Sequence, residues 1–484
     1  MSESEKRSTQ GVEYENVASD YMEQRQLQQG AAGWVLLAGL GVAYVISGDF
    51  AGWNFGLAEG GWGGMLIATL LMGTMYAAMI FGLAELSSTI PTAGGGYGFA
   101  RRAMGPLGGF ATGTAILIEY AIAPAAIATF IGGYMESLTG IGGWIVYLVF
   151  YLIFIGIHLY GVGEALKLMF AITAIAVVAL AAFVIGMIPL FDPANLFDIR
   201  PTDAAGASAF LPFGLVGIWA ALPYGIWFFL AIEGVPLAAE ETRNPQRDMP
   251  RGLIAGMVAL LVFAALILVF GPGASGAEVI QDSDNPLVEA VTSAYGGSNF
   301  LSSFINIAGL AGLIASFFSI IFAYSRQTFA LSRAGYLPKV LSLTGSRRTP
   351  WVALIVPGVI GFIGFIMALT GNGAILINIA VFGATISYVL MMLSHIVLRQ
   401  REPDLERPYR TPGGVATSGV ALVLAVLAVI ATFIVDPTAA FITLGVYALF
   451  LLYFGLYSRH HLVAQAPEEE FATIEKAESE LAGS

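Results

Sequence analysis

The sequence predicts an all-α integral membrane protein with twelve transmembrane helices. Three observations support this fold class: the composition, the length of the apolar runs and the placement of Lys and Arg. Hydrophobic residues make up 57% of the 484 residues and charged residues only 11%, whereas a soluble domain carries about 25% charged residues. The mean hydropathy of +0.78 also favours a chain that lies in a lipid bilayer.

Apolar runs recur along nearly the whole chain, and most are long enough for a helix to cross about 30 Å of hydrocarbon. The polar segment before the first run lacks the basic-then-apolar layout of a signal peptide, so we expect it to form a cytoplasmic tail. The twelve predicted spans cover approximately residues 34–58, 62–88, 107–136, 142–160, 164–189, 212–238, 251–271, 299–332, 350–370, 373–399, 414–435 and 438–458.

The basic residues predict the orientation, because short cytoplasmic loops of membrane proteins are enriched in Lys and Arg. With a cytoplasmic N-terminus, of 21 Lys and Arg only Arg200 falls on the outer side. The outer connections 191–211 and 272–298 carry acidic residues instead. We therefore expect a multi-pass membrane protein with both termini in the cytoplasm.

The domain organisation follows from the spans, since no sizeable soluble segment remains between them. The acidic stretch that starts at Glu468 is typical of a short acidic helix or a disordered end. The predicted units are a cytoplasmic tail at 1–33, a ten-helix core at 34–399, a loop with the last two helices at 400–459 and a cytoplasmic tail at 460–484.

The residue types argue against an enzyme. The chain has no cysteine and only four histidines, which leaves no thiolate metal site and little for metal chemistry. No Ser-His-Asp arrangement stands out, and a receptor would need a soluble domain. We expect no metal and no cofactor.

Two predicted spans contain helix-breaking residues together with an acid. Span one has Ser47-Gly48-Asp49 followed by Gly52, and span six has Glu233-Gly234-Val235-Pro236. Paired broken helices in corresponding positions of two halves indicate the binding site of a secondary transporter. The break leaves backbone groups unpaired, and the membrane tolerates these only where protein, water or ligand satisfies them. A simple proline kink in span six is the alternative.

Four segments carry a resemblance to a known family. They are Leu83–Phe110, Glu240–Arg251, Tyr324–Pro338 and Leu398–Gly413, and they resemble the amino acid–polyamine–organocation transporter superfamily. The resemblance implies two inverted five-span repeats, about 34–189 and 212–399, plus two peripheral helices. It also implies transport by alternating access.

A narrower resemblance rests on fewer residues. The segments Val45–Ala58, Gly94–Arg102 and Glu119–Ala125 are similar to the ethanolamine permease family. This similarity implies an importer of ethanolamine. Choline, a small polyamine, and neutral or cationic amino acids are the alternative substrates.

Asp49 is the residue that we expect to select the substrate by its charge. A charge near the middle of a span costs about 2.5 to 3.5 kcal/mol, so it faces a cavity and is paired. In amino acid carriers of the superfamily, N–H groups at this break receive the substrate carboxylate. Asp49 would repel such a carboxylate and would attract an ammonium. The alternative is that Asp49 caps the short second half of span one.

The remaining candidates surround the two breaks. Trp227 falls where the family places an aromatic lid, and a Trp face over a cation contributes about 0.5 to 2 kcal/mol. Tyr120 is a candidate for the substrate hydroxyl. The predicted substrate-binding residues are Ser47, Gly48, Asp49, Trp53, Tyr120, Trp227, Ala231, Ile232 and Glu233.

The sequence leaves three driving forces for transport: coupling to a proton, coupling to sodium, and passive uptake of a cation down the membrane potential. Glu233 either contacts the substrate or takes part in coupling. Glu119 either takes part in coupling or has a structural role. Ser316 and Ser319 could ligate sodium, although serines in membrane helices often bond their own preceding turn.

Overall fold

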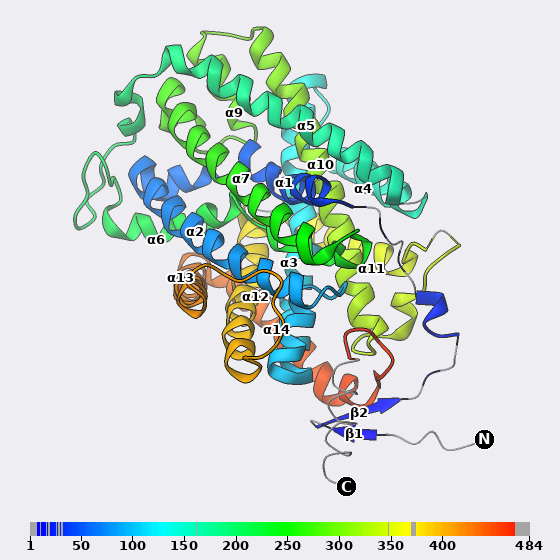
Figure 1. Cartoon of the computed structure of the whole chain (residues 1–484). Coiled ribbons are helices and arrows are strands. Elements are labelled where there is room, and N and C mark those ends of the chain that lie inside the picture. The colour runs from blue at the N-terminus through cyan, green and yellow to red at the C-terminus, as the bar shows by residue number, and fades with distance from the viewer. Residues whose placement is uncertain are drawn as a thin grey trace.

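The computed structural model describes residues 7–9, 11–15, 17, 20–25, 27, 30, 32–160, 162–346, 348–368 and 374–469, most of them in helices (Figure 1). In these residues the α-helices are α1 (Trp34–Phe50), α2 (Phe55–Thr89), α3 (Gly96–Thr139), α4 (Trp144–Tyr160), α5 (Val162–Met187), α6 (Gly214–Trp227), α7 (Pro245–Ser275), α8 (Ala277–Ile280), α9 (Pro286–Ala294), α10 (Phe300–Arg333), α11 (Trp351–Ala368), α12 (Ala374–Arg401), α13 (Val415–Val435) and α14 (Pro437–Leu456).

Short elements join and flank these helices. The 3-10 helices are η1 (Glu23–Arg25), η2 (Ile188–Leu190), η3 (Pro193–Phe197), η4 (Ile232–Glu241), η5 (Lys339–Ser342) and η6 (Ser458–His460). The strands are β1 (Arg7–Thr9), β2 (Val12–Glu15) and β3 (Leu462–Val463).

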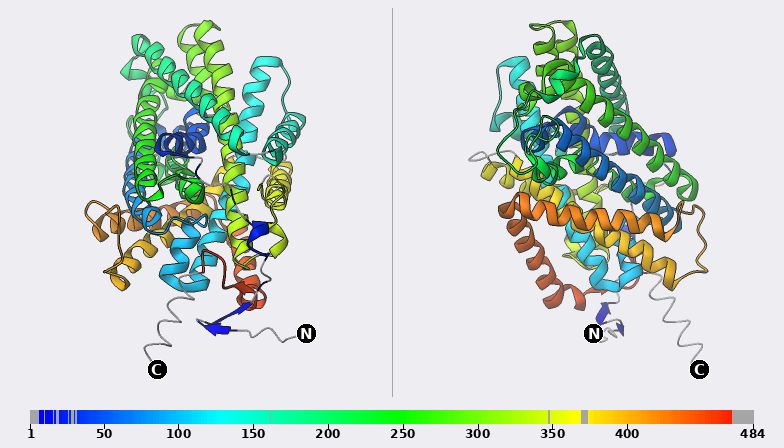
Figure 2. Two further views of the ribbon diagram at one scale, coloured as in Figure 1. Left: turned by 45° about the vertical axis from the view of Figure 1, so that its right-hand side comes forward. Right: turned by 90° about the vertical axis from the view of Figure 1, so that its left-hand side faces the viewer.

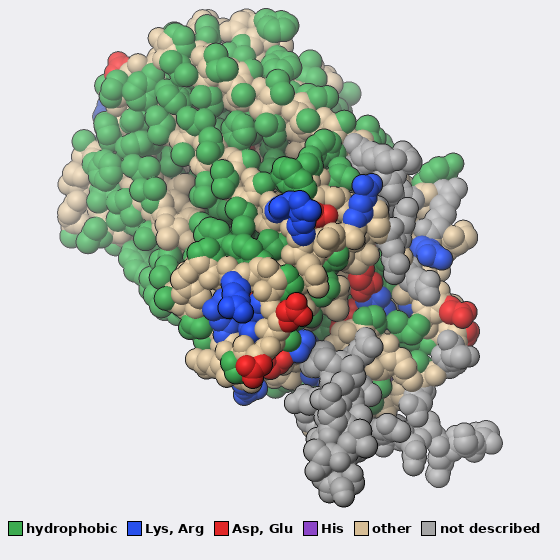
Figure 3. All heavy atoms as spheres, viewed as in Figure 1, with side chains coloured by type: hydrophobic (Ala, Val, Ile, Leu, Met, Phe, Trp, Pro, Cys, Tyr) green, Lys and Arg blue, Asp and Glu red, His purple; other side chains and the backbone are tan. Residues whose placement is uncertain are grey.

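The helices have the length and composition of membrane spans. Among the described residues, nine are long and apolar enough to cross a bilayer: α2, α3, α5, α6 together with η4, α7, α10, α12, α13 and α14. Helices α1, α4 and α11 are shorter and also apolar. Hydrophobic side chains cover most of the surface in Figure 3, whereas most of the charged side chains visible there gather near one end. The count of twelve spans stays a prediction.

Two glycines bend long helices at the places where the sequence predicts boundaries. Gly61 in α2 has φ 64° and ψ 178°, and it separates the end of span one from span two. Gly105 in α3 has φ 79° and ψ −173°. Both conformations lie outside the helical region and suit glycine. The segment before Gly105 is thus a short separate helix, and the kink lies close to the predicted start of the third span at residue 107.

The helix packing is reciprocal between the two halves of the chain. Helix α1 packs against α7, and α6 packs against α2. Helix α5 packs against α10, and α12 packs against α3. Helix α4 contacts α10, and α11 contacts α3. The first five spans can be matched in order with the next five. The contact of α1 with α7 then corresponds to the contact of α6 with α2, and the other two pairs of contacts correspond in the same way.

The two chain ends are joined to each other. Strand β2 pairs antiparallel with β1 and parallel with β3, so Tyr14 lies opposite Leu462. The blue strands and the red segment that holds β3 lie together at one end of the molecule (Figure 1, Figure 2). We call this end, formed by β1, β2 and residues 462–469, the tail face.

The acidic stretch at Glu468 corrects a prediction. Instead of a solvated helix or a disordered end, Glu468 is 1% exposed and Glu469 0% exposed. Glu469 forms an ion pair with Arg101 at 2.5 Å and accepts a hydrogen bond from Tyr336 at 3.0 Å. Glu468 pairs with Arg333. Both acids are therefore built into the end of the helix bundle; residues 470–484 lie outside the described residues.

Tyr14 completes this contact from the other chain end. Its hydroxyl donates to Glu469 at 2.8 Å. Burial, and then the negative charge of Glu469, raise the pKa of Tyr14 well above its usual range. Tyr14 therefore stays a hydrogen-bond donor throughout the physiological pH range.

Substitution of Glu469 tests this packing. Glu469→Gln leaves the buried Arg101 without its counter-charge, and loss of one partner from a buried pair costs about 3 to 5 kcal/mol. We expect a clear drop in the thermal unfolding temperature of the purified protein. Glu406→Gln, which neutralises an exposed acid, is the control and should leave that temperature unchanged. Equal temperatures for both variants would contradict a buried role for Glu469.

Candidate functional site

The first span breaks a few residues later than predicted. Helix α1 continues through Ser47 and Gly48 to Phe50, and α2 begins at Phe55, so the break comprises Ala51 to Asn54. Asp49 therefore lies in the last turn of α1 and not at the start of the second half. Asn54 occupies the N-cap of α2 and makes no capping hydrogen bond. The capping alternative for Asp49 is thus wrong.

Side chains from other helices satisfy the backbone of this break. Tyr134 donates to the carbonyl oxygen of Phe50 at 3.1 Å, and Trp227 Nε1 donates to that of Ala51 at 3.0 Å. The N–H of Gly52 donates to Asn54 Oδ1 at 3.0 Å. Two distant side chains and one within the break thus supply the partners that the membrane requires.

The amide of Asn54 fixes the break from the opposite side. Its Nδ2 donates to the carbonyl oxygens of Ile280 at 2.7 Å and Ser283 at 2.9 Å. Both acceptors lie at the end of α8 and just beyond it. Asn54 therefore joins the broken span to the connection between α7 and α9.

The second break precedes its predicted position. Helix α6 ends at Trp227, and the chain continues as the 3-10 helix η4 from Ile232. The break comprises residues 228–231, so Glu233-Gly234-Val235-Pro236 lies after it. Ala231 has φ 78°, a left-handed conformation that costs a residue other than glycine roughly 1–2 kcal/mol. Glu233 occupies the first turn of η4, where an acid is favoured.

The two breaks lie against each other. A Cβ atom at Gly48 would come within 2.4 Å of the carbonyl oxygen of Trp227. A Cβ at Gly52 would come within 2.5 Å of Trp227 Nε1, and Gly52 has φ 94°. Only glycine fits at both positions. The structure therefore brings Gly48 and Trp227 together, at the junction of spans one and six.

Asp49 is a buried acidic residue in the last turn of α1. It is 0% exposed. Among the residues that the structure describes, neither carboxylate oxygen has a hydrogen-bond partner. The C-terminal end of a helix carries a partial negative charge, so the last turn of α1 disfavours a second negative charge. A cation would relieve both costs.

Glu233 lies in a second, well-connected polar group. It is 3% exposed and accepts hydrogen bonds from the hydroxyls of Tyr120 and Tyr388, each at 3.2 Å. The Tyr388 hydroxyl lies 2.8 Å from that of Tyr76. Glu119 is fully buried and interacts electrostatically with Glu233, although neither of its carboxylate oxygens has a hydrogen-bond partner among the described residues. Tyr120, Glu119 and Glu233 are thus brought together, as a group distinct in its partners from Asp49.

The remaining predicted substrate-binding residues are buried, and some have apolar neighbours whereas Ser47 has a polar one. Trp53 is fully buried and stacks on Phe228 with centroids 5.3 Å apart. Ala231 and Ile232 are also fully buried. The Ser47 and Ser316 hydroxyls lie 2.8 Å apart.

The two serines of α10 that were predicted as sodium ligands have different partners. The hydroxyl of Ser316 donates to the carbonyl of Tyr44 at 2.7 Å, and so ties α10 to α1. The hydroxyl of Ser319 donates to the carbonyl of Ala315 at 2.7 Å, one turn earlier in its own helix. Only Ser316 therefore contacts the broken span.

Sequence reasoning missed the residues that hold the site in shape. Tyr134, Asn54, Tyr388 and Tyr76 support the breaks and the carboxylates from other helices. The available signal was polarity: buried tyrosine hydroxyls in apolar spans need partners. Their partners could not be inferred, because they depend on tertiary packing.

Comparison with known proteins decides the family. Residues 35–470 match the amino acid permease family. The chain belongs to this family. It is 30% identical to an uncharacterized transporter of Rhizobium meliloti (strain 1021), over 82% of this chain and 85% of the relative. The protein is therefore a multi-pass membrane transporter for a small molecule, and not an enzyme.

Two further relatives come from Bacillus subtilis (strain 168). A branched-chain amino acid permease is 26% identical over 80% of this chain and 83% of its own length. A methylthioribose transporter is 27% identical over 76% of this chain and 79% of its own length. Substrates thus differ widely between permeases that resemble this chain to a similar extent.

The partners of the first break give a direct test. In Tyr134→Phe, the buried carbonyl of Phe50 loses its donor, which costs about 1–3 kcal/mol. We expect a lower thermal unfolding temperature. Tyr295→Phe is the matched control, since the Tyr295 hydroxyl also donates to a backbone carbonyl, that of Gly186, but at an exposed position. Water can replace the lost donor there, so the control should match the unchanged protein.

Proposed function

We propose that this permease imports ethanolamine, a primary ammonium with a nearby hydroxyl, and that Asp49 binds the ammonium group. The observation that carries the proposal is the fully buried carboxylate of Asp49, which has no partner among the described residues. A buried charge without a partner is costly, and a bound cation stabilises it. The narrower sequence resemblance to ethanolamine permeases agrees with this substrate.

The break in span one also favours a substrate without a carboxylate. A carboxylate at a helix break needs free N–H donors. Here the N–H of Ala51 donates to the carbonyl of Ser47, and that of Gly52 donates to Asn54. With these two donors occupied and Asp49 beside them, the site suits an amine better than an amino acid.

The relatives support a second candidate, a neutral amino acid such as leucine, because one of them is named a branched-chain amino acid permease.

Choline and polyamines differ from ethanolamine in the partners that they need. A quaternary ammonium has no N–H to donate, so it would depend on aromatic faces such as those of Trp53 and Trp227. A diamine would need a second acidic partner.

Transport would follow alternating access in a fold of twelve spans. The reciprocal packing of α1 on α7 and of α6 on α2 supports two inverted repeats, because exchange of the halves maps one contact onto the other. The gathering of basic residues near the tail face supports a cytoplasmic location for both termini in the bacterial inner membrane.

Coupling to protons is favoured over sodium. Glu119 and Glu233 are both buried and interact with each other, and two carboxyl groups can form a hydrogen bond only when one of them carries a proton. A proton bound and released by this pair would drive uptake. The sodium alternative rests on Ser47 and Ser316, whose hydroxyls lie beside the carbonyl of Tyr44.

Asp49→Asn tests the ammonium site. The change keeps the size of the side chain and removes the charge, and a hydrogen bond to a charged group contributes about 1.5–3 kcal/mol. We therefore expect ethanolamine uptake into proteoliposomes to fall at least about tenfold, and ethanolamine no longer to raise the unfolding temperature. Without substrate, Asp49→Asn should be at least as stable as the unchanged protein, because an unpaired buried charge is lost.

The control and the competing substrates complete this experiment. Asp282→Asn makes the same chemical change at an exposed position and should leave uptake intact. Choline, putrescine, alanine and leucine are compared with ethanolamine in both assays. Transport of alanine or leucine as good as that of ethanolamine, together with normal ethanolamine uptake by Asp49→Asn, would refute the proposal.

Glu233→Gln tests coupling. In proteoliposomes with an imposed pH gradient, we expect uptake by the unchanged protein to exceed uptake without the gradient, and we expect Glu233→Gln to lose this difference. Glu278→Gln, at an exposed position, should retain it. Uptake that requires sodium and ignores the pH gradient would instead favour the site at Ser47 and Ser316.

A further inference from the structure

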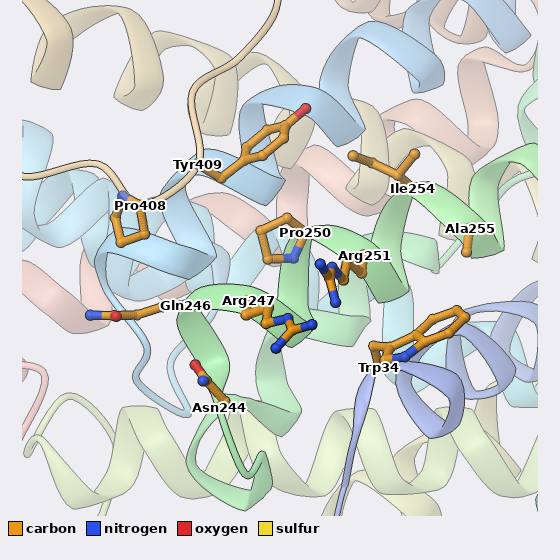
Figure 4. Close-up of a pocket in the computed structure, with 10 residues that line it drawn as sticks. All are labelled: Trp34, Asn244, Gln246, Arg247, Pro250, Arg251, Ile254, Ala255, Pro408 and Tyr409. Atoms are coloured by element: carbon orange, nitrogen blue, oxygen red, sulfur yellow. The ribbon is translucent and has the colours of Figure 1, made fainter.

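A cavity of about 870 Å³ opens on the surface between the start of α1, the start of α7 and the loop after α12 (Figure 4). Trp34 lines it from α1, Arg247, Arg251 and Ile254 from α7, and Tyr409 from the loop. None of these residues belongs to the substrate site. The cavity combines positive charge with aromatic and aliphatic surface.

The two arginines of this cavity differ from most others near them. Among the residues that the structure describes, the side chains of Arg247 and Arg251 form no ion pair or hydrogen bond. Both are exposed, and they are four residues apart on one face of α7. Arginines near the same end of the bundle are paired with glutamates, namely Arg101, Arg102, Arg326, Arg333, Arg399 and Arg407. The cavity thus presents positive charge that the protein itself does not neutralise.

The same face of α7 becomes apolar beyond the arginines. Ile254 and Ala255 line the cavity one turn after Arg251, and Val258 and Val262 follow at helical spacing. Val258 is 55% exposed and Val262 50% exposed, in a helix that crosses the membrane. At about 1.5 Å per residue, Val258 lies roughly 10 Å from Arg251 along the helix. A ligand with a negative head and an apolar chain matches this surface.

The aromatic residues indicate where the cavity lies relative to the bilayer. Trp34 is 43% exposed at the start of α1, and Tyr409 lies on the opposite flank in Figure 4. Trp and Tyr are enriched where the hydrocarbon meets the headgroups. The arginines therefore lie at headgroup level, and the valines lie beside the acyl chains.

We propose that this cavity binds the headgroup of an anionic phospholipid, with its phosphate on Arg247 and Arg251 and an acyl chain along α7. Basic pockets between membrane helices on the cytoplasmic side suit such headgroups. The inference rests on the cytoplasmic orientation of the proposed function, but it does not depend on the substrate.

The test compares lipid binding by the full-length protein and by Arg247→Gln/Arg251→Gln. Detergent-purified protein is titrated with phosphatidylglycerol, with phosphatidylcholine and with inorganic phosphate, and the unfolding temperature and the lipid adducts seen by native mass spectrometry are recorded. We expect phosphatidylglycerol to bind preferentially, and to bind the variant about 30-fold more weakly, which corresponds to about 2 kcal/mol.

Two controls keep the outcomes separate. Arg200→Gln/Arg348→Gln removes the same charge at exposed positions elsewhere and should bind phosphatidylglycerol normally. Ethanolamine should still stabilise the cavity variant; its failure to stabilise even the unchanged protein would refute the substrate and not the lipid site. Equal phosphatidylglycerol binding by variant and unchanged protein, or equal stabilisation by inorganic phosphate, would overturn the lipid proposal.

Discussion

Every backbone group that a broken helix leaves open inside the membrane needs a partner, and this requirement organises the centre of the protein. The carbonyls of Phe50 and Ala51 find theirs in Tyr134 and Trp227, which come from α3 and α6. Asn54 serves the N–H of Gly52 and at the same time reaches the carbonyl of Ile280. Because each partner comes from a different part of the chain, the break holds α1, α3, α6 and the α8 region in register. The residues that satisfy the break therefore shape the proposed substrate site as much as the residues that line it.

Against this background the carboxylate of Asp49 is an exception. The carbonyls of Phe50 and Ala51 and the N–H of Gly52 have partners, whereas the side-chain oxygens of Asp49 have none among the described residues. Asp49 also lies at the negative end of α1. Natural sequences keep such a local conflict mainly where function requires it. Glu233 shows the opposite arrangement, since it is held by two tyrosine hydroxyls at the favourable end of η4. The two acids therefore suit different tasks: Asp49 is available to a ligand, whereas Glu233 is available to a change of protonation within its own cluster.

The sequence was sufficient for properties that depend on local patterns. Apolar runs located most of the helices, and the predicted limits of the spans lie close to the kinks at Gly61 and Gly105. The two breaks were predicted in the correct spans but displaced by a few residues, because glycine and proline report where a helix can break and packing decides where it does. Ala231, which has a left-handed backbone without being glycine, carries no such signal.

Tyr134 and Asn54 could not be assigned as supports, since their partners lie 84 and 226 residues away in sequence. Glu469 was misjudged for the same reason: an acidic run near a chain end is normally solvated, and only the fold brings Arg101 and Tyr14 to it.

The tail face connects these findings to transport. Glu469 contacts Arg101 of α3 and Tyr336 just after α10, and Glu468 contacts Arg333 at the end of α10. The same Arg333 binds Glu240, near the end of η4, so the second half of the broken span six is tied to the chain end through one guanidinium. If transport follows the proposed alternating access and the protein opens towards this face, these pairs would separate. Hydration of the separated charges offsets much of the lost attraction, because burial of an ion pair already costs desolvation free energy. A closure made of buried ion pairs can therefore be specific in geometry and still open at moderate cost, whereas a closure made of packed apolar side chains would regain nothing from the water that enters.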